Sequence, residues 1–180
     1  MTITETRFRQ LLIIEPRIFR DGRGYFYESW NQQVFARAGI PDIFIQDNQS
    51  GSSKDVIRGL HFQIPPHEQG KLVRTLAGSV LDVVVDLRRS EPTYGQHFKM
   101  VINASGHKML FIPPGFAHGF LTLEDDTVFA YKCTKAYHAP SERSLRWDDP
   151  DLGIDWGIDK PILSDKDKQA ALFKGFRSPF

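Results

Sequence analysis

The stretch KLVRTLAGSVLDVVVDLR, residues 71–88, decides what kind of fold this chain adopts. Gly78 divides it into two short apolar segments, a pattern typical of two β-strands joined by a turn. In the second segment Asp82 and Asp86 alternate with valines on one face, while leucines and valines occupy the other face. Aspartates in such an alternation usually face solvent. The stretch therefore predicts an antiparallel sheet that is apolar on one side.

Short apolar segments broken by turns continue in both directions, at intervals of about 8–12 residues. They are LLIIEPRIF, YFYESW, IFI at residues 43–45, VIRGLHFQIPP, HFKMVIN, MLFIPPG, FAHGFLTL and TVFAYKCT. The polar residues QDNQSGSS that follow IFI are predicted as a loop. Candidate helices are short: NQQVFARAG, which ends at Gly39, and SDKDKQAALFKGF. No long helical period separates the strands. We predict an all-β fold, a double-stranded β-helix or jelly roll with a few short peripheral helices.

The composition predicts one soluble domain over residues 1–180, with a polar, turn-rich and helical tail from about residue 141. The net charge of +1 argues against a nucleic-acid binder. No stretch approaches the roughly 20 apolar residues of a membrane span. Cys133 is the only cysteine and lies in an apolar run, which favours an inert buried thiol. We therefore expect a cytoplasmic protein that binds neither nucleic acid nor membrane.

Two segments are similar to the halves of a cupin metal site, which pairs H-x-H and a later glutamate with P-x-G-x-x-H. The second half is intact in IPPGFAHGF, where its histidine is His118. In the first half His61 is followed by Gln63 instead of a second histidine, and Lys71 stands in the place of the glutamate. An ammonium group cannot ligate a divalent cation and repels it. The altered pattern therefore predicts a cavity that holds no metal.

The same residues favour proton transfer next to a carbonyl group. A neutral imidazole such as His61 abstracts a proton near neutral pH. The enolate oxygen that results needs a nearby cation, which Lys71 supplies. Tyr131 in VFAYKC is a candidate acid, and delivery to the opposite face of the carbon inverts it. Each residue alone is more often structural, and only their combination on one framework favours catalysis.

The segments FRDGRGYFYESW, QDNQS, IRGLHFQIPPHEQGKLV, GSVLDVVVDLR, TYGQ, FIPPGFAHGF, YKCTKAY and LGIDW…ILSDKDK resemble, in order, those of the dTDP-4-dehydrorhamnose 3,5-epimerase family. The resemblance covers nearly the whole chain. It implies a cofactor-free isomerase that inverts carbons 3 and 5 of dTDP-4-dehydro-6-deoxy-D-glucose, giving dTDP-4-dehydro-L-rhamnose. It also implies a homodimer in which residues cross between subunits.

The resemblance assigns catalytic roles residue by residue. The base falls on His61, the acid on Tyr131 and the group at the sugar ketone on Lys71. Asp167 of SDKDK would orient the base, although Asp82 is an alternative partner for the imidazole. Contacts to the nucleotide and pyrophosphate fall on Arg23, Phe26, Glu28, Gln46, Asp47, Asn48, Arg58, His118, Glu142, Lys166 and, stacked on thymine, Tyr137.

One assignment conflicts with strand geometry. Strict alternation sends Arg58 and His61 to opposite faces of their strand, yet both are expected at one cavity. Either Gly59 hosts a β-bulge, or Arg58 serves the cavity of a neighbouring subunit.

Other functions stay open on the sequence alone. A 3-epimerase or a ketoisomerase acting on a related dTDP-4-keto-6-deoxy sugar would use the same scaffold. A metal-dependent cupin enzyme would need a displaced ligand such as Glu68. A sugar-nucleotide-binding module without catalysis would need the cavity but not the base.

Overall fold

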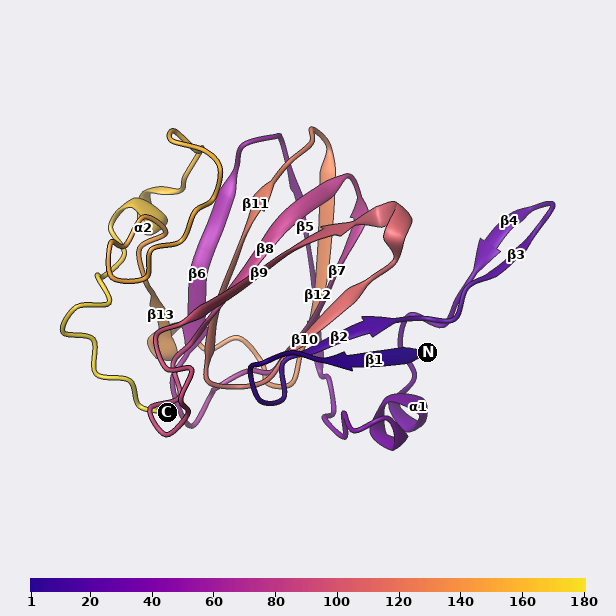
Figure 1. The fold of residues 1–180 in the computed structure, drawn as a ribbon, viewed down its shortest axis with the longest axis horizontal. Coiled ribbons are helices and arrows are strands. Elements are labelled where there is room, and N and C mark those ends of the chain that lie inside the picture. Colours follow the sequence, from indigo (N-terminus) through magenta and orange to yellow (C-terminus); the bar gives the residue numbers. More distant parts are fainter.

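Two antiparallel sheets form the body of the protein (Figure 1). The computed structural model describes residues 1–180. The six-stranded sheet has the order β1 (Thr2–Glu5), β2 (Leu12–Glu15), β10 (Met109–Ile112), β7 (Lys71–Ala77), β12 (Thr127–Cys133) and β5 (Gln46–Ser52). The five-stranded sheet has the order β13 (Glu142–Ser144), β6 (Ile57–Gln63), β11 (Phe116–Thr122), β8 (Ser79–Asp86) and β9 (His97–Asn103). The predicted all-β jelly roll is confirmed.

The remaining elements lie outside the two sheets. They are the hairpin of β3 (Phe19–Asp21) and β4 (Gly24–Phe26), the helices α1 (Gln32–Arg37) and α2 (Asp165–Lys168), and the 3-10 turns η1 (Ala104–Gly106) and η2 (Ala139–Ser141). Figure 1 shows the β3–β4 hairpin projecting from the body on the side opposite α2. None of the helices has the length and apolar character needed to cross a membrane.

Three segments differ from the prediction. The strand predicted in YFYESW ends at Phe26, because its only partner, β3, begins at Phe19, which pairs with Phe26. The polar residues 46–52, predicted as a loop, form β5, which pairs along its whole length with β12. The predicted C-terminal helix is only the four residues of α2. Beyond it, Phe173 and Phe176 pack against the five-stranded sheet, which holds the chain in an irregular path.

The apolar core has three parts. Between the sheets, Val73 and Phe129 meet Val84 from the opposite layer. The outer face of the five-stranded sheet is covered by the C-terminal tail, including Trp156. The outer face of the six-stranded sheet is covered by α1 through Phe35. The C-terminal tail is thus fixed to the sheet that carries His61.

The two aspartates of β8 are buried, which contradicts the expectation of a solvated face: both Asp82 and Asp86 are 0% exposed. They face the interior of the jelly roll, where burial of a carboxylate requires hydrogen-bonding partners. Asp86 accepts bonds from the Arg88 guanidinium at 2.6 and 2.8 Å and from the Thr93 hydroxyl at 2.6 Å.

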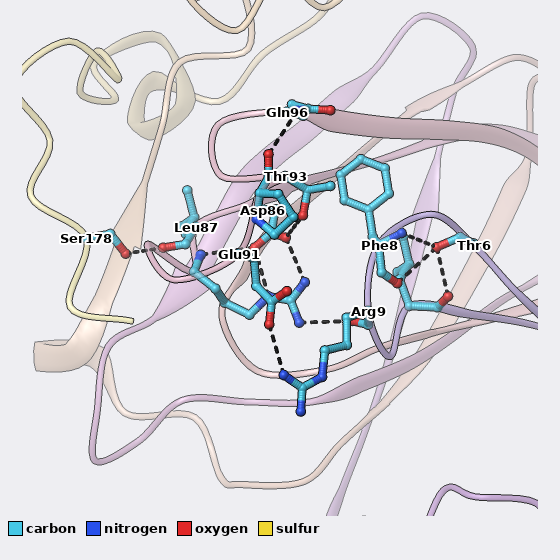
Figure 2. A network of polar contacts seen from close by, with 12 residues as sticks. Thr6, Phe8, Arg9, Asp86, Leu87, Glu91, Thr93, Gln96 and Ser178 are labelled. Carbon is cyan, nitrogen blue, oxygen red and sulfur yellow. Dashed lines mark hydrogen bonds and ion pairs between the residues drawn. The ribbon is translucent and has the colours of Figure 1, made fainter.

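The Asp86 network joins distant parts of the chain at one end of the jelly roll. Figure 2 shows Asp86 and Thr93 close to the N-terminal Arg9 and the C-terminal Ser178. Arg9 reaches Glu91 at 3.3 Å, and the Ser178 hydroxyl donates to the carbonyl of Leu87. Asp86 holds the Arg88 guanidinium, which donates to the Arg9 carbonyl at 2.9 Å, so this network ties the N-terminal segment to the body, and Leu87 ties the C-terminal segment.

A bulge in β6 resolves the conflict between Arg58 and His61. In the pairing with β11, His118 lies opposite His61 and Phe120 opposite Arg58, so β6 has one residue more than β11 over this span. Gly59, at φ +127°, supplies the extra residue. The bulge places both side chains on the cavity side of the sheet, so the alternative that requires a neighbouring subunit for Arg58 is unnecessary.

Substitution of Gly59 tests the bulge. A Cβ at this position would lie 2.5 Å from the Gly119 Cα and 2.7 Å from the His118 carbonyl oxygen, with a φ that side chains rarely adopt. We expect Gly59→Ala to lower the free energy of unfolding by about 3 kcal/mol in urea titration. Gly51→Ala, which has open space and no positive φ, is the matched control. Equal stability of the two variants would contradict this account.

Candidate active site

The imidazole of His61 is held by a carboxylate from the far end of the sequence. Its Nε2 lies 2.5 Å from Oδ1 of Asp167, which is 3% exposed. Burial raises the pKa of Asp167, but hydrogen bonds from His61 and Ser164 outweigh it and leave the pKa below its usual value. The ionised carboxylate keeps the proton of the neutral ring on Nε2, so Nδ1 is the nitrogen available as a base.

The tail passes the start of β6 before it reaches His61. Ile162 forms a parallel bridge with Val56, and the Ile57 N–H donates to the Ile162 carbonyl at 3.0 Å. Ser164 then caps α2: its hydroxyl accepts from the Asp167 N–H at 3.1 Å and donates to Oδ2 of the same residue at 2.8 Å. The Asp167 carboxylate is therefore fixed on both oxygens.

Lys71 and Tyr131 line the same cavity as His61, a space of about 510 Å³ between the two sheets. His61 comes from the five-stranded sheet, whereas Lys71 and Tyr131 come from the six-stranded sheet. The Lys71 ammonium lies 5.7 Å from the centre of the Tyr131 ring. A ligand between the sheets therefore has the imidazole on one side and the ammonium and phenol on the other.

Burial shifts the pKa values of Lys71 and Tyr131 in opposite directions. It lowers the pKa of Lys71, and the negative charges of Asp82 and Glu142 only partly oppose this. It raises the pKa of Tyr131, so the phenol keeps its proton. Desolvated charges interact strongly with charge that develops nearby, which suits Lys71 to an oxyanion.

The second imidazole of the cavity, His118, has its own carboxylate. Its Nε2 lies 2.9 Å from Oδ2 of Asp82, and both residues are buried. The two possible aspartate partners are thus divided: Asp167 pairs with His61, and Asp82 with His118. Oδ1 of Asp82 is buried without a hydrogen-bond partner.

A second cavity of about 280 Å³ adjoins the 510 Å³ cavity, and His61, Lys71 and Tyr131 line both. We call the larger space the first lobe of the site and this one, which extends toward the loop before β13, the second lobe. Its lining includes the predicted nucleotide contacts Gln46, Asn48, Tyr137 and Glu142. The Tyr137 hydroxyl donates to Glu142 at 2.9 Å. Burial raises the pKa of Glu142, but hydrogen bonds from Lys166 and Tyr137 outweigh this and lower it. Lys166 reaches Glu142 at 2.5 Å, so these predicted residues come together.

Arg58 lies at the mouth of the first lobe, where it donates to the Ser52 hydroxyl at 3.1 Å. Four predicted residues lie elsewhere. Asp47 alternates to the outer face of β5 and pairs with Lys132 at 2.8 Å. The other three belong to the projecting hairpin and the segment after it: Arg23, Phe26 and Glu28. Phe26 is 69% exposed, and this chain brings none of the three to its own cavity.

The altered metal-ligand positions have other partners. The amide of Gln63 bonds to loop backbone at the edge of the second lobe. Glu68, the candidate displaced ligand, pairs with Lys135 at 2.7 Å and does not line either lobe. The structure contains no group of three or more His, Cys, Asp or Glu side chains placed to hold a metal ion.

Sequence reasoning missed several cavity residues. Ser164 was not predicted, although the S-x-x-D pattern of a helix N-terminus stands in the sequence. Phe120, Ile162 and Leu163 form an apolar wall of the first lobe. No local pattern indicates this wall, because it joins a strand to a tail segment that is distant in sequence.

The chain is similar along most of its length to proteins of one enzyme family. The family model described as dTDP-4-dehydrorhamnose 3,5-epimerase matches residues 5–175. A dTDP-4-dehydrorhamnose 3,5-epimerase from Shigella flexneri is 46% identical over 168 residues, 93% of each chain. The crystal structure of a dTDP-6-deoxy-D-glucose-3,5-epimerase from Legionella pneumophila in complex with dTDP-4-keto-L-rhamnose is 46% identical with a TM-score of 0.91, covering 96% of this chain and 93% of that chain.

A more distant likeness is also informative. The structure of a 3'-monoepimerase from Streptomyces bikiniensis in complex with dTDP-quinovose is 32% identical, with a TM-score of 0.87 over 93% of this chain and 85% of that chain. The fold, the site and these likenesses define a jelly-roll isomerase. More particularly, the chain belongs to the dTDP-4-dehydrorhamnose 3,5-epimerase family.

Titration of Lys71 tests the electrostatics of the cavity. We expect the ¹³C NMR signal of reductively methylated Lys71, assigned by its loss in Lys71→Arg, to titrate below the ordinary lysine value of 10.5, because burial disfavours the charged form. Asp82→Asn removes a nearby negative charge and should move the midpoint further down. If Lys71 titrates together with the exposed lysines, it is not desolvated in the cavity.

Proposed function

We propose that this protein epimerises dTDP-4-dehydro-6-deoxy-D-glucose at carbons 3 and 5, giving dTDP-4-dehydro-L-rhamnose, by proton transfer that needs no metal or other cofactor. One observation carries the proposal: the His61–Asp167 pair and the Lys71–Tyr131 pair face a single cavity from opposite sheets. The sugar nucleotide bound to the Legionella pneumophila relative supports the substrate class.

Each inversion has two steps. Nδ1 of His61 removes the hydrogen next to the ketone as a proton, and the electrons of the C–H bond form a C=C bond while the ketone oxygen becomes an enolate. Lys71 stabilises that oxygen. The enolate then takes a proton from the Tyr131 hydroxyl on the opposite face. His61 and Tyr131 return to their starting protonation states by exchange with solvent, and the sequence repeats at the second carbon.

The second lobe supports binding of the nucleotide. Tyr137 offers an exposed aromatic face for thymine, with Gln46 and Asn48 beside it. Arg58 at the mouth of the first lobe supplies a guanidinium for the pyrophosphate, and His118 lies deeper in that lobe. Glu142 and Lys166 complete this wall as an ion pair.

We further propose a homodimer in which the β3–β4 hairpin serves the cavity of the partner. Three aromatic side chains of the hairpin are at least half exposed, Phe19 at 50%, Tyr25 at 58% and Phe26 at 69%, which is costly in a free monomer. Contact with a second copy would cover them and would place Arg23 and Glu28 near its nucleotide lobe. In this proposal residues 1–180 act as one domain, and the enzyme works in the cytoplasm.

A second candidate is epimerisation at carbon 3 alone. The likeness to the Streptomyces bikiniensis 3'-monoepimerase favours it, because a single scaffold hosts both outcomes. In such an enzyme the enolate formed at carbon 5 would not be reprotonated on the opposite face before release.

Identification of the product tests the proposed function. We expect incubation with dTDP-4-dehydro-6-deoxy-D-glucose, followed by borohydride reduction and hydrolysis, to yield rhamnose and 6-deoxytalose, the two reduction products of the doubly inverted ketone. Inversion at carbon 3 alone would yield 6-deoxyallose and 6-deoxygulose. Recovery of only unchanged quinovose and fucose would contradict catalysis and leave a binding module.

Two variants assign the roles in the same assay. His61→Asn and Tyr131→Phe should each lower kcat by about a hundredfold or more, with binding of dTDP by calorimetry nearly unchanged. Tyr94→Phe, whose ring packs on Phe173 outside the cavity, is the control for loss of a phenol hydroxyl. Full activity in either site variant would remove that residue from the mechanism.

Mixing of two inactive variants tests the shared hairpin. His61→Asn has an intact hairpin, and the double variant Arg23→Ala/Phe26→Ala has an intact cavity. After unfolding and refolding together in equal amounts, we expect about a quarter of the wild-type sites to be active, because half of the dimers are mixed and each has one complete site. Absence of recovery would indicate that the hairpin does not act on a partner.

A further inference from the structure

The side chain of Gln63 joins two loops at the edge of the nucleotide lobe. It stands at the end of β6 and is 4% exposed. Its Nε2 donates to the His67 carbonyl at 2.7 Å and to the Ala136 carbonyl at 3.3 Å, and its Oε1 accepts from the His138 N–H at 2.7 Å. Both ends of the amide are therefore used, and no buried polar atom of Gln63 is left without a partner.

One of these two loops, residues 134–138, carries Tyr137, and the backbone groups that bond to Gln63 lie on either side of this tyrosine. Ala136 precedes and His138 follows this tyrosine, so one amide fixes the backbone on both sides of it. The Tyr137 N–H itself donates to Oε1 of Gln46 at 2.8 Å. Two glutamines, one from each sheet, thus set the position from which the exposed Tyr137 ring projects.

Other contacts hold the same two loops together. The rings of His67 and His138 stack with their centres 3.7 Å apart. Lys135 pairs with Glu68 at 2.7 Å, and Gln69 donates to the Lys135 carbonyl at 2.7 Å. Several contacts therefore hold residues 63–69 to residues 134–138, and Gln63 is the buried residue among them.

We propose that Gln63 is a positioning residue for the nucleotide base, acting through Tyr137 without contacting the reacting carbons. The inference rests on the proposed function, because it requires the base to stack on Tyr137. The proposal also explains why Gln63 stands in place of the second histidine of the H-x-H pattern. At this position the side chain anchors the base-binding loop instead of ligating a metal.

Only an amide satisfies all three bonds at this position. Glutamate has the same shape but lacks the two N–H donors, so two carbonyl groups would face a carboxylate oxygen. Methionine has a similar length but offers neither donor nor acceptor to the buried backbone groups. We therefore expect both substitutions to release the loop, and none of the three lost bonds involves a residue of the proposed catalytic set.

The experiment compares two probes, dTDP and inorganic pyrophosphate, by calorimetry. For Gln63→Glu and Gln63→Met we expect the Kd of dTDP to rise about tenfold, since a buried backbone group loses its partner. The Kd of pyrophosphate, which has no base to stack, should stay within about twofold. In turnover, KM should rise with dTDP affinity while kcat at saturation is kept. Gln96→Glu, an exposed glutamine outside the cavity, is the control for added charge.

The outcomes of this experiment distinguish failure of the role proposed for Gln63 from failure of the proposed function. Unchanged dTDP affinity in both variants would overturn the role of Gln63. A parallel loss of dTDP and pyrophosphate affinity, or a fall in kcat with KM kept, would also overturn it, because damage would then extend beyond the loop. If the wild-type protein itself does not bind dTDP, the proposed function fails.

Discussion

The hydrogen bond between His61 and Asp167 is the contact on which the rest of the site depends. It joins a strand in the middle of the chain to a helix near the C-terminus, with Nε2 of His61 2.5 Å from Oδ1 of Asp167. The tail reaches this point because its aromatic residues cover the outer face of the five-stranded sheet. In addition, Ile162 bridges to Val56, just before the start of β6. The packing of an otherwise irregular tail is thereby tied directly to the chemistry of one imidazole.

Charged and polar side chains from both sheets line the cavity. Lys71 stands where a carboxylate ligand is expected, and burial lowers its pKa. A desolvated ammonium stabilises an oxyanion more strongly than a hydrated one does. Opposite it, Asp167 bonds to the imidazole of His61, and Asp82 bonds to that of His118. The two imidazoles of the cavity are thus each held by a carboxylate, one from the tail and one from β8.

Much of this was predictable from the sequence, and the failures have physical causes. Alternation and turns predicted the jelly roll. The substituted metal pattern predicted His61, Lys71 and His118 at one cavity, which the structure confirms, and Tyr131, predicted as a candidate acid, lines the same cavity. Alternation failed at Gly59, where a bulge restores Arg58 to the cavity, and at Asp82 and Asp86, which are buried because their partners come from other elements. The role of Gln63 and the apolar wall near Phe120 depend on loops and tail segments whose contacts leave no local pattern. Contacts of the hairpin residues Arg23, Phe26 and Glu28 stay predictions, because they would involve a second subunit.

Exchange of substrate hydrogens with deuterated water is the most direct test of the central claim, that an imidazole and an ammonium alone create and hold the enolate. With chelator-treated protein, the account predicts deuterium at both carbon 3 and carbon 5, at a rate unchanged by added divalent metal, and loss of this exchange in Lys71→Met. Exchange that requires a stoichiometric bound metal, or that proceeds at the full rate without the lysine, would contradict it.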